Sequence, residues 1–186
     1  MERLFFYAKT STFVKEETHK TMYTTPINKT SLLFVCLGNI CRSPAADAIM
    51  HKIVKEAGEE DNFMIDSAGT YGGHAGSLPD PRMRAHGARR GYVFDHRSRR
   101  VTADDFECFD YIFAMDDANY DDLRRLAPTI EARDKVLRIA DYFEHYQYDC
   151  VPDPYYGGAD GFENVLNLLE DACENIYKRL KHAIEL

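Results

Sequence analysis

The feature that most constrains the fold is an alternation of short, mostly apolar runs with longer segments of mixed polarity, which becomes regular after residue 30. Each run has the length of a strand, and the segments between runs are long enough for helices. The runs cover residues 32–36, 63–68, 110–115 and 135–139. Strands separated by helix-length connections form parallel sheets, because a parallel crossover needs such a connection. We therefore predict an α/β fold: a single domain with a four-stranded parallel sheet and helices on both faces.

The segments between the strands carry helix signals. Ser43 followed by Pro44 predicts a helix with Ser43 as its N-cap and Pro44 as its first residue, and Gly58 is suited to its C-terminal end. The last segment repeats apolar residues at spacings of three and four, which is typical of a helix with one buried face. Further helices are predicted over about residues 82–90, 117–126 and 162–184. Right-handed crossovers then bring the loops that follow the strands to one edge of the sheet.

Residues 1–30 differ from the rest of the chain. They are rich in Thr and Lys and show neither strand nor helix periodicity, so we predict a flexible N-terminal extension without assigned function, followed by one domain over residues 31–186. The apolar run from Leu4 to Ala8 is interrupted by Lys9 and is too short for a secretory signal. No stretch approaches the roughly 20 apolar residues that span a bilayer. We expect a cytoplasmic protein with no membrane segment.

Charge and cysteine content exclude several classes of function. The formal net charge is −8, and residues 1–30 carry more basic than acidic groups, so the body is strongly acidic. An acidic body argues against nucleic-acid binding, which needs a basic surface. The odd number of five cysteines, without a signal peptide, argues against a disulfide framework. Cys36 and Cys41 have no second Cys/His pair for zinc, and we expect Cys108 and Cys173 to be small buried residues.

The segment from Cys36 to Arg42 joins the first strand to the first helix. A loop in this place can turn its amides inward to form a nest for an oxyanion, with the positive end of the helix behind it. Gly38 permits a tight turn, and Asn39 tolerates a left-handed backbone. Such surroundings favour the thiolate of Cys36, and the fork of Arg42 can bind two phosphate oxygens. Ser43 can donate to the sulfur. A Cys-x5-Arg string alone is usually accidental, but this context predicts a phosphate-binding loop.

Four segments resemble the low-molecular-weight protein-tyrosine phosphatase family. Residues 34–44 are similar to its active-site loop, and Asp153-Pro154-Tyr155-Tyr156 is similar to its proton-donor loop. Residues 66–70 and 79–82 also match, and the similarity covers about residues 31–186. The resemblance implies hydrolysis of phosphotyrosine through a phosphocysteine on Cys36, without a metal ion or organic cofactor. The residues it assigns to phosphate binding are Leu37, Gly38, Asn39, Ile40, Cys41, Arg42 and Ser43.

The resemblance makes Asp153 the general acid and base. A leaving phenolate must be protonated, and Pro152 and Pro154 stiffen the backbone on both sides of this carboxyl group. By itself, an Asp between prolines is more often a turn residue. The family also implies a substrate rim of Ile40, Tyr155 and Tyr156, where an aromatic ring can stack on a phosphotyrosine. The alternative is that the two tyrosines are ordinary loop residues.

Other roles also come from the resemblance. It places Asn39, Ser43, Ser67 and His96 in one network that supports the loop, whereas His96 judged alone would be a surface histidine. It lets Cys41 form a reversible disulfide with the nucleophile, against the alternative of a small buried residue that fills the loop. Many family members carry a Trp before the Pro-Asp-Pro-Arg segment. This chain has no Trp, and Tyr71 or His74 is expected to form that wall.

Three rival functions stay open. An arsenate reductase of the same fold needs further cysteines to relay a disulfide, and Cys108 has no nearby partner in the sequence. A protein-arginine phosphatase carries Thr where this chain has Ile40. A non-catalytic phosphopeptide-binding module would not need the set of Cys36, Arg42 and Asp153. The expected partners are phosphotyrosine-containing proteins, with a tyrosine kinase as one candidate.

Overall fold

The computed structural model describes residues 29–155 and 158–184, so most of the predicted extension and Tyr156 lie outside the described residues. Its centre is a four-stranded sheet with all strands parallel and the order β2-β1-β3-β4, which confirms the predicted architecture. The strands are β1 (Thr30–Cys36), β2 (Phe63–Gly69), β3 (Tyr111–Ala114) and β4 (Val136–Arg138). β1 therefore begins one residue before the predicted domain boundary.

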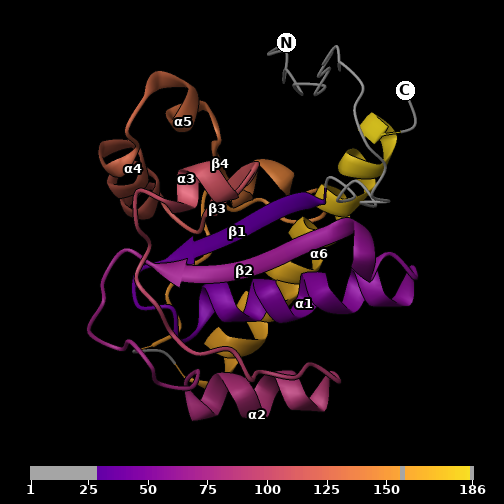
Figure 1. The fold of residues 1–186 in the computed structure, drawn as a ribbon. Helices are drawn as coiled ribbons and strands as arrows, with labels where there is room; N and C mark the ends of the chain where they lie inside the picture. The colour runs from indigo at the N-terminus through magenta and orange to yellow at the C-terminus, as the bar shows by residue number, and fades with distance from the viewer. Residues whose placement is uncertain (1–28, 156–157, 185–186) are drawn as a thin grey trace, which may run out of the picture.

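Helices cover both faces of this sheet (Figure 1). The long helices α1 (Arg42–Glu56) and α6 (Ala159–Ile184) lie against one face, with α2 (Pro81–Arg89) beyond them. The other face carries the short helices α3 (Asp105–Cys108), α4 (Asp117–Leu126) and α5 (Ile130–Asp134). Two 3-10 turns, η1 (Glu60–Asn62) and η2 (Ile139–Tyr142), complete the order. Among the described residues, no helix combines the length and apolar character needed to cross a bilayer.

The alternation of side chains along β1 divides the core in two. Leu32 and Phe34 join the apolar cluster that includes α1 and α6, and Phe34 stacks on Phe113 with ring centroids 5.4 Å apart. Leu33 and Val35 point the other way, into the cluster under α3, α4 and α5. All four β1 side chains are fully buried, as expected for a central parallel strand. The same alternation directs Cys36 to the α1 side of the sheet.

The structure corrects three expectations. α1 begins at Arg42 rather than at Pro44, and the N-cap position is held by Cys41 without a side-chain cap bond. Ser43 is therefore not the N-cap, because its hydroxyl is used by the loop beside it. The helices α3 and α5 were not predicted, since segments of four and five residues show no period. Cys108 is exposed rather than buried because it ends α3 at the surface, whereas Cys173 is buried as expected.

The connections bring three loops together at the carboxyl ends of the strands. The chain leaves β1 toward β2 and returns past β1 to form β3, so β1 and β3 flank the point where the strand order reverses. Crevices at such points are the usual sites of open α/β sheets. The loop after β1 begins directly behind Cys36, the last residue of that strand, and the loop after β3 contains Asp116. A third loop joins them through the N–H of Val151, which donates to the carbonyl of Met115 at 2.8 Å.

Candidate active site

The thiol of Cys36 lies inside the loop that links β1 to α1, and the residue is 2% exposed. Its Sγ accepts the backbone N–H of Asn39 at 3.2 Å and lies 3.1 Å from Oγ of Ser43. Asn39 has a φ of +53°, a left-handed conformation that its side chain tolerates. This turn brings the Asn39 amide back onto the sulfur, beside the first residues of α1. A thiolate would meet an amide, a hydroxyl and the positive end of a helix at this place.

The side chain of Asn39 connects the loop to its surroundings, and it is completely buried. Its Nδ2 donates to Oγ of Ser43 at 2.9 Å and to Oγ of Ser67 at 3.0 Å. Its Oδ1 accepts Nε2 of His96 at 3.0 Å and the backbone N–H of Arg99 at 2.9 Å. The structure thus brings together all four residues proposed for loop support. Because every polar atom of this amide has a partner, the loop is held in one shape.

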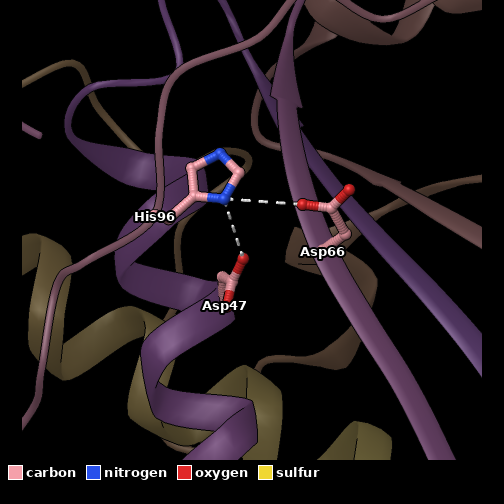
Figure 2. A group of neighbouring side chains, drawn as sticks. All are labelled: Asp47, Asp66 and His96. Carbon is pink, nitrogen blue, oxygen red and sulfur yellow. Dashed lines mark ion pairs between the residues drawn. The ribbon is translucent and has the colours of Figure 1, made fainter. Parts of the chain in front are cut away.

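A second set of charged groups lies behind His96 (Figure 2). Nδ1 of His96 faces Oδ1 of Asp66 at 3.5 Å and Oδ2 of Asp47 at 3.9 Å. Burial raises the pKa of Asp47 to about 6, against the opposing charge of His96. These three side chains place ligand atoms within 4.8 Å of one another. Asp66 is already paired with Arg99 at 2.8 Å, so we interpret the cluster as a charge network that fixes His96.

Arg42 lies at the first turn of α1 and is 3% exposed. One nitrogen, Nη1, donates to Oδ2 of Asp116 at 2.5 Å and to the carbonyl of Val151 at 3.1 Å. The other, Nη2, donates to Oδ2 of Asp153 at 3.2 Å. Burial alone would lower the pKa of Arg42, but the charges of Cys36, Asp116 and Asp153 raise it above its ordinary value. The guanidinium is therefore a fixed positive charge between the loops.

Asp153 lies on the third loop next to Arg42, and its side chain is 43% exposed. Its Oδ2 contacts Arg42, and its Oδ1 accepts the backbone N–H of Tyr155 at 3.0 Å. Val151 anchors the start of this loop and is fully buried. The two sides of the site therefore differ in burial, with the thiol enclosed and the carboxyl group open to solvent. A carboxyl group that is partly exposed can exchange its proton with water.

The rim of the site is aromatic and partly apolar. Tyr71, Leu37 and Tyr155 are 57%, 48% and 38% exposed, and Ile40 is half-buried. The rings of Tyr71 and His74 meet edge to face at 6.2 Å, and a Cβ on Gly38 would lie 3.1 Å from Cδ2 of His74. The expected wall beside the loop is thus built by Tyr71 and His74 together. Tyr156 lies outside the described residues.

Cys41 is buried in the loop and has a free thiol. Burial first, and then the negative charge of Asp80, raise the pKa of Cys41 well above its ordinary value. This sulfur is therefore protonated at neutral pH.

Three contributors were missed in the sequence. Asp116 caps α4 with one oxygen, which accepts the N–H of Asn119 at 2.8 Å, and its other oxygen holds Arg42. Its position directly after β3, at the edge shared with Cys36, was the available signal. Gly69 ends β2 where a Cβ would lie 2.6 Å from the carbonyl of Leu37. Only glycine fits there. The close approach to Leu37 cannot be predicted from the residues next to Gly69 in the sequence. Arg82, considered below, is the third.

Comparison with known proteins agrees with this geometry. Residues 31–185 match the sequence family described as low molecular weight phosphotyrosine protein phosphatase. A low molecular weight phosphotyrosine protein phosphatase of Schizosaccharomyces pombe is 43% identical over 150 residues, which are 80% of this chain and 96% of that protein. A crystal structure of a protein tyrosine phosphatase from Entamoeba histolytica superposes with a TM-score of 0.81 at 46% identity, covering 83% of this chain and 99% of that one.

A more distant structure is that of DARP, a Drosophila arginine phosphatase, with a TM-score of 0.76 and 32% identity over 81% of this chain and 97% of that one. The family match and the relatives above 30% identity extend over nearly the whole described domain. The chain therefore belongs to the low molecular weight phosphotyrosine protein phosphatase family and is a phosphoric monoester hydrolase.

Proposed function

We propose that this enzyme hydrolyses phosphotyrosine in proteins by way of a phosphocysteine on Cys36. In the first step the Cys36 thiolate attacks phosphorus, the bond to the phenolic oxygen breaks, and Asp153 gives its proton to the leaving oxygen. In the second step Asp153 takes a proton from water, which attacks the phosphocysteine and releases inorganic phosphate. Arg42 and the amides of residues 37–43 hold the non-bridging oxygens in both steps.

The observation that carries the proposal is the surroundings of Cys36 Sγ. An amide at 3.2 Å and a hydroxyl at 3.1 Å converge on one buried sulfur next to a guanidinium that is 3% exposed. Hydrogen bonds to the sulfur favour its anionic form and help it to leave in the second step. Ser43 suits this exchange because its hydroxyl can turn between the carbonyl of Ala68, at 3.1 Å, and the sulfur. A non-catalytic phosphopeptide-binding module would not need a Cys36 sulfur that is stabilised as a leaving group.

The rim supports an aromatic substrate. Tyr71 and Tyr155 offer partly exposed rings, and Ile40 of the loop adds a half-buried apolar side chain. A phosphotyrosine ring can stack there, whereas phosphoserine is too short to contact the rim while its phosphate reaches the sulfur. Phosphoarginine is the strongest rival substrate, because a structural relative is an arginine phosphatase. Its charged guanidinium would gain less from these rings and from Ile40.

The test compares substrates and variants in one assay. We expect turnover of p-nitrophenyl phosphate and of a phosphotyrosine peptide, little turnover of phosphoserine or phosphoarginine peptides, and no turnover by Cys36→Ser. Cys108→Ser is the matched control, since Cys108 is exposed on α3 and takes no part in the site. Preference for phosphoarginine would replace this substrate, and arsenate-dependent consumption of thiols would indicate a reductase.

We further propose that the substrates are phosphotyrosine proteins of the cytoplasm, with a tyrosine kinase as one candidate. Cys36→Ser used as a trap in a pull-down identifies them, since it binds phosphate esters without forming the phosphocysteine. The redox role of Cys41 also remains a prediction. If Cys41 resolves oxidised Cys36, activity lost to peroxide returns with dithiothreitol in the parent but not in Cys41→Ser. Equal recovery in both would remove this role.

A further inference from the structure

Arg82 lies between the phosphate-binding loop and the loop of Asp153. Its Nε and Nη2 donate to Oδ1 and Oδ2 of Asp80 at 3.0 and 2.8 Å, so the two side chains meet in a two-pronged pair. Asp80 is 8% exposed, and its backbone N–H donates to the carbonyl of Ile40 at 2.8 Å. Ile40 belongs to the phosphate-binding loop. The guanidinium of Arg82 thus has a fixed position relative to that loop.

The same guanidinium lies against two aromatic rings. Its central carbon is 4.9 Å from the ring centre of Phe162 and 5.4 Å from that of Tyr155. Both distances are within the range of a cation–π contact. Phe162 is a core residue near the start of α6 and is 1% exposed, whereas Tyr155 is 38% exposed. Arg82 therefore connects an exposed ring of the third loop to a buried ring of the core.

The ring of Tyr155 is close in the chain to the catalytic carboxyl group. The backbone N–H of Tyr155 donates to Oδ1 of Asp153, so a shift of this residue turns the carboxyl group. The other oxygen of Asp153 contacts Arg42, which in the proposed mechanism must bind phosphate. During catalysis Asp153 then needs support that does not come from Arg42. Arg82 can give it through Tyr155 without touching the substrate.

We propose that Arg82 is a positioning residue that holds the Asp153 loop over the phosphate-binding loop through its contact with Tyr155. This inference rests on the proposed function. A purely structural role would be the N-terminal cap of α2. That cap uses the backbone N–H of Arg82, which donates to Asp80 at 2.8 Å. Replacing the guanidinium alone leaves that cap in place, so loss of the acid's position can be separated from loss of the helix.

The experiment uses two substrates that differ in their need for an acid. Phenolate is a poor leaving group and needs protonation, whereas p-nitrophenolate leaves readily without it. We expect Arg82→Met to lower kcat/KM for phenyl phosphate by about tenfold and that for p-nitrophenyl phosphate by at most about twofold. Arg82→Lys keeps the charge but not the planar fork, and we expect an intermediate loss for phenyl phosphate.

Two further variants make the test specific. Arg84→Met removes an exposed arginine of the same helix and should leave both substrates unaffected. Adding Arg82→Met to a Tyr155→Leu background should change the ratio of the two kcat/KM values little, because Arg82 acts through that ring. Thermal unfolding checks that each variant folds.

Two results overturn the inference. One is an Arg82→Met variant that slows both esters equally or neither, while the parent is active. The other is a double variant, Arg82→Met with Tyr155→Leu, in which the two substitutions change the ratio of kcat/KM for the two esters independently of each other. A parent chain that hydrolyses neither ester would instead reject the proposed function, and the inference would fail with it.

Discussion

The phosphate-binding loop and the loop of Asp153 face each other across the site but are held in different ways. Asn39 and Ser43, in the first loop, are fully buried and share a continuous set of hydrogen bonds with Ser67 and His96. In the loop of Asp153 the side chain of this residue is 43% exposed. Among the described residues, its two oxygens pair only with Arg42 and the backbone N–H of Tyr155. Stabilising a phosphoryl group requires groups that do not reorganise, whereas a proton donor must exchange with water.

Arg42 belongs to the phosphate-binding loop but contacts the loop of Asp153. It joins α1 to Asp116, Val151 and Asp153 by hydrogen bonds. The two regions are therefore separate in their support and joined at one guanidinium. We therefore expect the effect on catalysis to be largest for replacing Arg42, smaller for removing the carboxyl group of Asp153, and smallest for removing the buried amide of Asn39.

Replacing the junction should have the largest effect. Arg42→Lys keeps a positive charge but loses the fork that contacts two phosphate oxygens, so we expect kcat/KM for p-nitrophenyl phosphate to fall by about 10³-fold. Steady-state kinetics and inhibition by vanadate measure this loss. Arg84→Lys is the matched control on an exposed position of α2. A loss below about tenfold would mean that the loop amides alone bind the phosphoryl group.

Removing the carboxyl group of Asp153 should have the second-largest effect on catalysis. Asp153→Ala deletes the proton donor, so we expect kcat/KM for phenyl phosphate to fall by about 10²-fold and that for p-nitrophenyl phosphate to fall less. Because the side chain is 43% exposed and, within the described part of the chain, pairs only with Arg42 and a backbone N–H, the free energy of unfolding should change little. Equal losses for both esters, or a marked loss of stability, would assign Asp153 to the rigid region instead.

Breaking the buried network should reduce stability more than the acid variant does, and rate less. Asn39→Ala removes the hydrogen bonds that this amide makes to Ser43, Ser67 and His96. We expect it to cost about 2–3 kcal/mol of stability and about tenfold in kcat/KM. Asn39→Gly also lacks the amide but tolerates the φ of +53°. The difference between the two variants therefore measures backbone strain. Unchanged stability in both would contradict the support assigned to this side chain.

The smallest effect concerns the charges behind His96. Burial raises the pKa of Asp47 to about 6, so the folded chain keeps a proton that the unfolded chain releases near pH 4. This group therefore destabilises the fold increasingly as pH rises from about 4 to about 6, and by a constant amount above that range. We expect Asp47→Asn to match the parent at pH 4 and to exceed it by about 1–2 kcal/mol at pH 7.

Urea unfolding at both pH values measures this difference in stability. The exposed Asp61 of η1 provides the control variant Asp61→Asn, for which we expect no comparable pH-dependent gain. A gain for Asp47→Asn that is the same at pH 4 and pH 7 would show that the carboxyl group is not held protonated by burial.

How far the sequence predicts the molecule also differs between these regions. The strands, the loop at Cys36 and the left-handed Asn39 follow from local patterns, because apolar runs, a strand–helix junction and a tolerant side chain are each visible within a few residues. The support for Asp153 is not local. Arg82 and Asp116 reach the site from residues distant in the chain, and their partners are defined only once the sheet has formed.

The errors have similar physical reasons. Ser43 has the residue type of an N-cap, but the sulfur and Asn39 use its hydroxyl, and the helix starts at Arg42. Cys108 has the type of a buried residue, but it is the last residue of a four-residue helix whose buried side chains are Asp105 and Phe106. Propensity predicts what a side chain can do, and tertiary contacts select among these uses.

The most direct measurement traps the covalent intermediate. The enzyme is mixed with phosphotyrosine peptide, quenched within the first turnovers and digested after Lys and Arg, which releases residues 30–42 with both Cys36 and Cys41. Fragmentation in the mass spectrometer then assigns the phosphoryl group to one sulfur. We expect phosphate on Cys36, more of it in Asp153→Ala, and none in Cys36→Ser. Turnover without a phosphorylated cysteine, or with phosphate on Cys41, would contradict the mechanism through a Cys36 phosphocysteine.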